Sequence, residues 1–364
     1  MTDRRSNSQK PVTRRVTLRD VAERAGVSVC TASLVLSGKD EGRVSESTRG
    51  RVRAVARGLD YKPDLIARGL KTRQTYLFGL VIESAVSSFF ADVIQGIQDV
   101  SEQEGYNMLL YTTNDDSDKE ARFLQVLKER DVDGIIVSPS STRNISFLNE
   151  LYEGGTAVVG VLNVSDKARY AQISVDNFHG GFIATEHLIN LGHRRIAHLS
   201  AQDEGFDQGR DRFRGYVEAL CRYGIELDDT LVINADYDWE QGYSAARKLL
   251  AMKDPPTAIF ACSDMGAWGA MRAVRELGLS VPGDVAIVGY DNLSIAPQLE
   301  VPLTTVDQPK YEIGRMSMLA LLDAMTFREV RDQVITPRLV VRQSTGEPRS
   351  ASTAGYTGSD LNNK

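Results

Sequence analysis

Short apolar runs alternate with amphipathic segments along most of this chain, from residue 76 to about residue 345. Such alternation is typical of parallel β-sheets, in which a helix returns the chain to the start of the next strand. Eight runs have the length and composition of buried strands: LFGLVI, NMLLYTT, DGIIVS, AVVGVL, RIAHLS, TLVINA, TAIFA and DVAIVG. Eight strands suit two doubly wound lobes better than one sheet. The spacing therefore predicts an α/β core of two parallel-sheet lobes, with a ligand site between them at the carboxyl ends of the strands.

The first 75 residues differ from this core in charge. They hold 17 Lys and Arg against 8 Asp and Glu, a balance of +9, whereas the rest of the chain holds 26 against 41, a balance of −15. A compact basic segment favours a polyanionic partner, because Lys and Arg side chains displace counterions from phosphates. Charge alone leaves open the alternative that this is merely a solvated basic face.

Residues 16–62 of the basic segment predict three short helices. Thr17, Ser28 and Ser45 are each placed to cap a helix that begins at the next residue, and Gly26 can end the first helix in a left-handed conformation. Apolar residues recur at helical spacing in each segment, so the three helices would enclose a small core. The tight turn between the first two helices is typical of a helix-turn-helix unit, although spacing alone also allows a protein-interaction domain.

The two ends of the chain predict no folded structure. Residues 1–15 are basic and polar without an apolar stretch, which indicates a disordered arm rather than a secretory signal, and residues 346–364 resemble a disordered tail. No apolar run approaches the roughly 18 residues of a membrane span. Cys30, Cys221 and Cys262 lie far apart and form no metal-binding or disulfide pattern. We expect a cytoplasmic protein with no metal, no cofactor and no membrane partner.

The amino-acid identities in these segments carry information beyond their spacing. TLRDVAERAGVSVCTASLVLSGKDEGRVSESTRGRV and LDYKPDLIARGLKTRQT resemble the lactose-repressor/galactose-repressor family of bacterial transcription regulators. The resemblance continues through FGLVIE, DGIIVSP, SVDNFHGG, HLINLGHRRIAHLSA, SDMGAWGAMRAVRELGL, VPGDVAIVGYDN and PLTTVDQP, and it covers about residues 16–345. It implies a repressor of carbohydrate-utilisation genes with a periplasmic-binding-protein-like core. Such a protein binds a palindromic operator in double-stranded DNA as a homodimer, under the control of a small-molecule effector.

The resemblance also implies where the domains begin and end. The expected parts are a helix-turn-helix domain at 16–62, a hinge helix and linker at 63–75, and an effector-binding and dimerisation core at 76–345. The chain crosses between the lobes of this core more than once. The first lobe is expected to hold about 76–171 and 307–332, and the second about 172–306 and 333–345.

By resemblance, the helix after Ser28 enters the major groove of the operator. Val29, Cys30 and Leu34 lie at the family's main base-reading positions, and many relatives carry Arg at the position of Leu34. An Arg there can pair with guanine through two hydrogen bonds, whereas these three side chains offer an apolar surface suited to thymine methyl groups. We therefore expect an operator that differs from those of Arg-bearing relatives. Polar side chains would anchor the phosphates: Thr17, Ser28, Thr31 and Ser33.

The segment after the third helix predicts a hinge. Pro63 would end that helix, and DLIARGL can form one helix too short to be stable alone. In the resemblance, the hinge helices of two protomers pair in the minor groove, where Leu70 wedges a base step and Ala67 permits close approach. Asp64 stands where relatives often have Asn, and its charge disfavours a direct DNA contact at this position.

The resemblance places the effector between the two lobes. The residues carried over are Phe89, Phe90, Ser138 and Asn163 from the first lobe and Arg212, Tyr237, Ser263 and Asp291 from the second, with Gln308 as a weaker candidate. Aromatic rings can pack on the C–H face of a pyranose, and a guanidinium or carboxylate can bind hydroxyls in pairs, so a sugar is the leading ligand class. Ser263 and Asn163 replace the Asn and Asp frequent at these positions, which leaves the ligand's identity open.

Two other classes of function deserve comparison. An enzyme is not expected, because the chain contains no GxSxG, HExxH, GxxxxGK[ST] or GxGxxG motif. A sugar-binding protein without a DNA function would leave the basic helix-turn-helix segment unexplained. A corepressor-dependent regulator of non-sugar metabolism remains an alternative within the same family.

Overall fold

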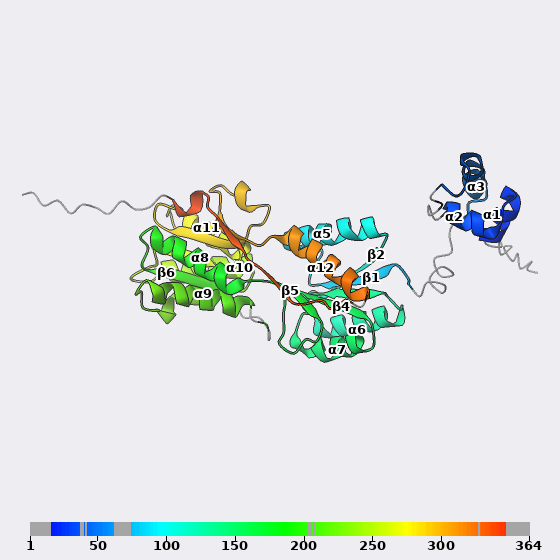
Figure 1. The fold of residues 1–364 in the computed structure, drawn as a ribbon. Helices are drawn as coiled ribbons and strands as arrows, with labels where there is room; N and C mark the ends of the chain where they lie inside the picture. Colours follow the sequence, from blue (N-terminus) through cyan, green and yellow to red (C-terminus); the bar gives the residue numbers. More distant parts are fainter. Residues whose placement is uncertain are drawn as a thin grey trace, which may run out of the picture. The chain divides into compact units, whose positions relative to one another are not determined.

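The computed structural model describes residues 16–36, 40, 42–61, 74–201, 206, 208–326 and 328–346. The chain divides into two compact units, which meet between Thr75 and Tyr76 and are described here one at a time (Figure 1). The predicted basic arm, nearly all of the predicted tail and most of the predicted hinge, including Ala67 and Leu70, lie outside the described residues.

The N-terminal unit consists of three helices around a small apolar core: α1 (Leu18–Ala25), α2 (Val29–Leu36) and α3 (Glu46–Gly58). The side chain of Thr17 caps α1 through the backbone N–H of Asp20, and Gly26 ends α1 with a φ of 65°. Ser45 caps α3 through the N–H of Thr48. Local capping therefore sets where these helices begin and end, as the sequence predicts. The buried core residues are Val21, Ala22, Ala25, Ala32, Val35, Val52 and Ala56.

The second unit contains two six-stranded sheets, one in each lobe. The first has the order β11-β5-β4-β3-β1-β2 and all its strands are parallel, whereas in the second, β12-β10-β9-β8-β6-β7, only the β10–β12 pair is antiparallel. The first sheet is built of β1 (Leu77–Ile82), β2 (Asn107–Thr112), β3 (Gly134–Val137), β4 (Ala157–Val161), β5 (Ala171–Val175) and β11 (Gln333–Ile335). The second is built of β6 (Ile196–Ser200), β7 (Val232–Asn234), β8 (Ala258–Ala261), β9 (Ala286–Asp291), β10 (Thr304–Asp307) and β12 (Arg338–Val340). The predicted fold class is confirmed.

Helices cover both faces of each sheet, which makes each lobe a three-layer sandwich (Figure 1). In the first lobe α5 (Ser88–Glu104) packs against α12 (Lys310–Met325) on one face, and α6 (Ser117–Glu129) and α7 (Ile145–Glu153) cover the other. In the second lobe the pair α8 (Asn177–Asn190) and α9 (Gln208–Arg222) covers one face, and the pair α10 (Trp239–Leu250) and α11 (Asp264–Glu276) covers the other. Short 3₁₀ turns join some of these elements at Thr142–Asn144, Asp229–Leu231, Ala296–Gln298 and Gln343–Thr345.

Glycine allows paired helices to cross closely in both lobes. A Cβ on Gly314 of α12 would lie 2.0 Å from the carbonyl oxygen of Val93 in α5. A Cβ on Gly215 of α9 would lie 2.1 Å from the carbonyl oxygen of Phe178 in α8. Both distances are far below van der Waals contact with backbone that cannot rotate away, so no larger residue fits without moving a helix.

The strands at the crossings between lobes correct the expected boundaries. Residues 171–175 form β5 and belong whole to the first sheet, so the first crossing follows residue 175 rather than 171. Residue 307 ends β10 in the second sheet, and residues 333–335 form β11 in the first. These strands are short and mix polar with apolar residues, so they resemble loops in the sequence. None of the described helices has both the length and the apolar character that a membrane crossing needs.

Candidate functional site

Helix α2 presents one face to the apolar core of the N-terminal unit, the headpiece, and a second face to solvent. Ala32 and Val35 are buried, whereas Val29 is 45% exposed and Cys30 and Ser33 are also exposed. Leu34 lies between these faces and is half-buried. Of the predicted base-reading residues, Val29 and Cys30 are therefore exposed and Leu34 is half-buried.

The hydroxyl groups at the start of α2 hold the helix end together. Ser28 Oγ accepts a hydrogen bond from the backbone N–H of Thr31 at 3.0 Å and lies 2.9 Å from Thr31 Oγ1. Ser28 is therefore an N-cap, as the sequence predicts, and its neighbours' N–H groups point outward at the positive end of the helix dipole. Such a helix end is suited to a phosphate. Thr17 holds the corresponding position at α1 through its capping box with Asp20.

Helix α2 itself carries no ionic side chain, since its sequence is VCTASLVL. Exposed arginines lie on the neighbouring helices, Arg19 and Arg24 on α1 and Arg53 and Arg57 on α3. Arg49 differs because it is half-buried and forms ion pairs with Asp40 at 2.6 Å and with Glu46 at 2.7 Å. Arg49 therefore fastens the loop before α3, a role that sequence spacing gave no signal for.

Arg212 is a buried charged group of the second lobe. It lies on α9, is 2% exposed, and donates from Nε to Asn177 Oδ1 at 2.9 Å and from Nη1 to the carbonyl oxygen of Cys262 at 2.5 Å. Its guanidinium carbon lies 3.8 Å from the ring centroid of Tyr290 and 5.6 Å from that of Tyr237. The structure thus brings Arg212 and Tyr237 together as expected. It adds Asn177 and Tyr290, which fix the guanidinium plane.

Asp291 ends strand β9 beside this cluster. Its backbone has a φ of 111°, and its Oδ1 accepts a hydrogen bond from Gln308 Nε2 at 2.7 Å. Burial raises the pKa of Asp291 above its ordinary value, and the nearby Arg212, Gln308 and Lys310 oppose this rise. Asp291 and Gln308 are therefore partners, which supports the weaker of the predicted candidates.

Ser263 and its neighbour Asp264 serve the start of α11. Ser263 is 1% exposed, and its Oγ accepts from the N–H of Gly266 at 3.0 Å, so the hydroxyl is an N-cap. Asp264 accepts from Thr305 Oγ1 at 2.5 Å and from the N–H of Leu293 at 2.7 Å. Burial, together with the nearby Asp291, raises the pKa of Asp264 to about 8, so this carboxyl group retains its proton at neutral pH. Sequence reasoning missed Asp264, because its partners are distant in sequence.

The polar residues predicted from the first lobe, Ser138 and Asn163, are uncharged. Ser138 is buried at the end of β3, and Asn163 follows β4 and donates from Nδ2 to the carbonyl oxygen of Pro139 at 2.8 Å. Asn163 Oδ1 also accepts from Nε2 of Gln208 at the start of α9, which joins the two lobes directly. The carboxyl ends of neighbouring parallel strands thus place Ser138 and Asn163 at the same edge.

The two adjacent phenylalanines have different environments. Phe90 is 5% exposed and packs in the core between the first sheet and α5, whereas Phe89 is half-buried. Their ring centroids lie 5.4 Å apart in an edge-on arrangement. Burial assigns Phe90 to core packing, so Phe89 is the better ligand candidate of the pair.

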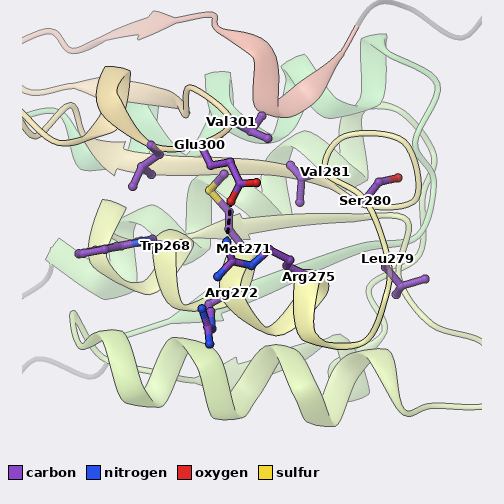
Figure 2. Close-up of a pocket in the computed structure, with 10 residues that line it drawn as sticks. Trp268, Met271, Arg272, Arg275, Leu279, Ser280, Val281, Glu300 and Val301 are labelled. Atoms are coloured by element: carbon purple, nitrogen blue, oxygen red, sulfur yellow. Dashed lines mark hydrogen bonds and ion pairs between the residues drawn. The ribbon is translucent and has the colours of Figure 1, made fainter.

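A separate pocket of about 270 Å³ opens on the second lobe, formed by α11 and by the loops around residues 279–281 and 299–301 (Figure 2). Arg275 and Glu300 form an ion pair there with an N–O distance of 2.6 Å, and Trp268 lies at its rim. None of the predicted effector residues lines this pocket. Across the described ranges, no group of three or more His, Cys, Asp or Glu side chains is arranged to hold a metal ion.

Comparison with known proteins bears directly on this arrangement. Residues 17–64 match the model of bacterial regulatory proteins of the lacI family, and residues 185–345 match the periplasmic binding protein-like domain. The HTH-type transcriptional repressor PurR of Proteus mirabilis (strain HI4320) is 37% identical over 336 residues, which cover 91% of this chain and 97% of that protein. This chain belongs to the lacI family of bacterial regulatory proteins.

Solved structures of the lacI family agree over most of the chain. The Lac repressor dimer bound to operator and the anti-inducer ONPF is 28% identical with a TM-score of 0.81, and the match covers 92% of this chain and all of that one. The complex of the transcriptional regulator CelR with cellobiose is 33% identical with a TM-score of 0.68 and covers 91% of this chain and all of that one. This lacI-family protein is a DNA-binding transcriptional regulator and not an enzyme.

Proposed function

We propose that the protein is a homodimeric repressor of carbohydrate-utilisation genes that acts in the cytoplasm and is controlled by a sugar bound between its lobes. The observation that carries the effector site is the fixed guanidinium of Arg212 between Tyr290 and Tyr237, with the Asp291 carboxyl group nearby. A pre-oriented guanidinium and a carboxyl group can bind hydroxyl pairs, while aromatic faces accept the C–H surface of a sugar ring. Solved lacI-family neighbours include complexes with cellobiose and with ribose.

The remaining members of the proposed effector site come from both lobes. Phe89, Ser138 and Asn163 would contact the ligand from the first lobe, while Ser263 and Gln308 would support it from the second. Closure of the lobes on a ligand would change the population of DNA-binding conformations, with a coupling of about 1 to 3 kcal/mol. We expect a sugar to act as an inducer that releases the operator.

Effector control is tested by gel-shift binding to DNA upstream of the protein's own gene and its neighbours. A panel of mono- and disaccharides, including cellobiose and ribose, is added to the full-length protein. We expect one sugar to weaken DNA binding at least tenfold, and we expect Arg212→Met to lose this response. A sugar that raises the melting temperature in the absence of any DNA binding would instead indicate a sugar-binding protein without a DNA function.

A second effector class is favoured by the position of the Arg212 guanidinium carbon 3.8 Å from the centroid of the Tyr290 ring. Aromatic rings and guanidinium groups also suit a planar nitrogen heterocycle, and one relative, 37% identical, is a repressor named PurR. The same panel therefore includes hypoxanthine and guanine. Stronger operator binding in the presence of one of these bases would identify a corepressor-dependent regulator of non-sugar metabolism.

The operator is proposed to be palindromic and read by two headpieces. One short recognition helix specifies few base pairs, so two half-sites about 34 Å apart, one per protomer, provide the missing specificity. We propose that Val29, Cys30 and Leu34 contact thymine methyl groups, while Thr17, Ser28, Thr31 and Ser33 contact phosphates. Ala67 and Leu70 of the hinge would bind the minor groove.

The apolar reading surface is tested by selecting sites from random double-stranded DNA, followed by a base-by-base substitution scan. We expect no guanine whose effect depends on residue 34. Leu34→Arg should add a preference for guanine at one position of each half-site worth about 1 to 3 kcal/mol. As a matched control, Arg57→Gln should weaken binding to all sequences equally and reduce its salt dependence. If wild-type protein prefers guanine strongly at one position and Leu34→Ala removes this preference, the thymine-methyl assignment is wrong.

A further inference from the structure

Lys310 is a buried cation at the point where the chain passes from the second lobe to the first. It is the first residue of α12 and is 5% exposed. Its Nζ donates to three backbone carbonyl oxygens, those of Asp291 at 2.5 Å, Asn292 at 3.1 Å and Gln308 at 3.3 Å. An ammonium group has three N–H donors, so this geometry can engage all of them. Burying a lysine is costly unless such partners are present.

Two of the three carbonyls belong to a strained turn. Asp291 has a φ of 111° and Asn292 a φ of 50°, both in the region that favours glycine. Residues held in such conformations persist only where the surroundings fix them. Lys310 binds the carbonyls of both strained residues, so it contributes directly to holding this turn.

Other contacts hold the same turn from the second lobe. The N–H of Asn292 donates to Thr305 Oγ1 at 3.2 Å, and the N–H of Leu293 donates to Asp264 Oδ2 at 2.7 Å. The Asn292 side chain donates to Asp307 Oδ1 at 2.9 Å and accepts from Arg342 at 2.7 Å. Lys310 alone among these partners lies on α12, which packs against α5 in the first lobe.

We propose that Lys310 is a positioning residue, whose ammonium group holds the Asp291–Asn292 turn and thereby orients the Asp291 carboxyl group toward the effector. This inference rests on the proposed function in that Asp291 contacts the ligand. Because Lys310 begins α12, any rotation of the first lobe against the second acts first on the backbone that carries Asp291. The ammonium group thus links effector recognition in the second lobe to movement of the first.

Hydrogen–deuterium exchange of the full-length protein tests the positioning role without an effector. In Lys310→Met, which keeps most of the side-chain volume, the Asn292 and Leu293 amides should exchange at least tenfold faster than in wild type. Lys310→Gln, which keeps two donors on a shorter arm, should give a smaller increase and provides a milder variant if the first folds poorly. Met318→Ala is the matched control, since it removes a buried side chain from the same helix away from the turn. It should lower the melting temperature while leaving exchange at residues 291–293 unchanged.

Calorimetric titration with cellobiose, ribose and hypoxanthine then separates this inference from the proposed function. A compound that binds wild type should bind Lys310→Met at least tenfold more weakly and Met318→Ala within twofold of wild type. If none of the three binds wild type, the effector assignment fails while the exchange result still decides the role of Lys310. Equal exchange at residues 291–293 in Lys310→Met and Met318→Ala would show that Lys310 only supports general stability.

Discussion

The two lobes of the core share a fold but differ in the chemistry of their facing edges. Both sheets arrange their first five strands in the same relative order, and both are covered by helices on two faces. Yet the ionisable groups among the predicted effector residues, Arg212 and Asp291, both lie on the second lobe. The first lobe presents the uncharged Ser138 and Asn163.

This difference suggests that the lobes have separate tasks. Charged groups recognise a ligand best when their own partners hold them in place before it arrives. Arg212 meets this condition within one lobe, because Asn177, Cys262 and Tyr290 all belong to the second lobe. The Arg212 cluster can therefore keep its geometry while the lobes open and close, whereas movement of the first lobe reaches Asp291 through Lys310.

Removing the charge of Arg212 should cause the largest loss of effector affinity. Arg212→Met leaves Asn177 Oδ1 and the carbonyl oxygen of Cys262 without their charged donor. Hydrogen bonds from charged groups contribute about 1.5 to 3 kcal/mol each, so we expect a loss of about 100-fold in effector affinity and a lower melting temperature. Calorimetric titration measures the affinity. Arg214→Met, on an exposed arginine of the same helix, is the control and should bind as wild type does.

The helix crossings should show what the lobes have in common. Gly314→Ala in the first lobe and Gly215→Ala in the second would each place a Cβ against a backbone carbonyl oxygen at about 2 Å. We expect each to lower the free energy of unfolding by about 1 to 3 kcal/mol, measured from denaturant midpoints. Gly50→Ala in α3 has no atom within 4 Å of the new Cβ and should be neutral or stabilising. A large effect in only one lobe would show that the crossings are not equivalent.

The pH dependence of stability should isolate Asp264. Its native pKa of about 8 lies above the value of an unfolded aspartate, so the native state retains a proton that the unfolded state has lost. The contribution of Asp264 to stability is therefore full below about pH 4 and declines as pH rises toward 8, by at most about 1.4 kcal/mol per pH unit. Asp264→Asn, an analogue of the protonated acid, should reduce the fall in unfolding midpoint between pH 7 and 8.5.

The groups around Asp264 define how this pH experiment is controlled. Asp291 raises the pKa of Asp264, whereas Lys310 and the Thr305 hydroxyl lower it. His198 is not a source of error in this range, because burial lowers its native pKa to about 4 and the unfolded residue is mostly neutral by pH 7. An Asp264→Asn protein with the same pH dependence as wild type would show that Asp264 is ionised in the native state.

The smallest effect is expected from the first lobe. Ser138→Ala removes one uncharged hydroxyl group from the edge of the first sheet. A neutral hydrogen bond contributes about 0.5 to 1.5 kcal/mol, so effector affinity should change less than about tenfold in the same titrations. A loss as large as that of Arg212→Met would mean that recognition is shared equally between the lobes.

Local signals made the headpiece predictable from sequence. Thr17, Ser28 and Ser45 each bond to an N–H three residues away, and Gly26 adopts its left-handed conformation within the same turn. In the core, eight strands could be identified because each is a short, mainly apolar run between amphipathic segments. The strands β5, β10, β11 and β12 could not, because they are short and mix polar with apolar residues.

The cleft was predictable only in part. Arg212, Tyr237, Asp291 and Gln308 could be placed by resemblance, and the structure brings them into one cluster. The network that fixes them joins residues far apart in sequence, such as Asp264 with Thr305, 41 positions away. A buried aspartate and a buried lysine do not differ from surface residues in a single sequence, so Asp264 and Lys310 carried no local signal of their role.

The absence of ionic side chains on α2 has a consequence for how this regulator responds to the salt of its surroundings. Dissolved ions compete with a protein's cations for phosphates, so they weaken the overall grip on DNA. The proposed contacts of α2 with thymine methyl groups involve no charge for which dissolved ions could compete. The preference for one operator sequence over another should therefore vary little with ionic strength, even where total operator occupancy falls. In a cell under osmotic stress, repression would weaken at all operators before the protein loses its sequence specificity.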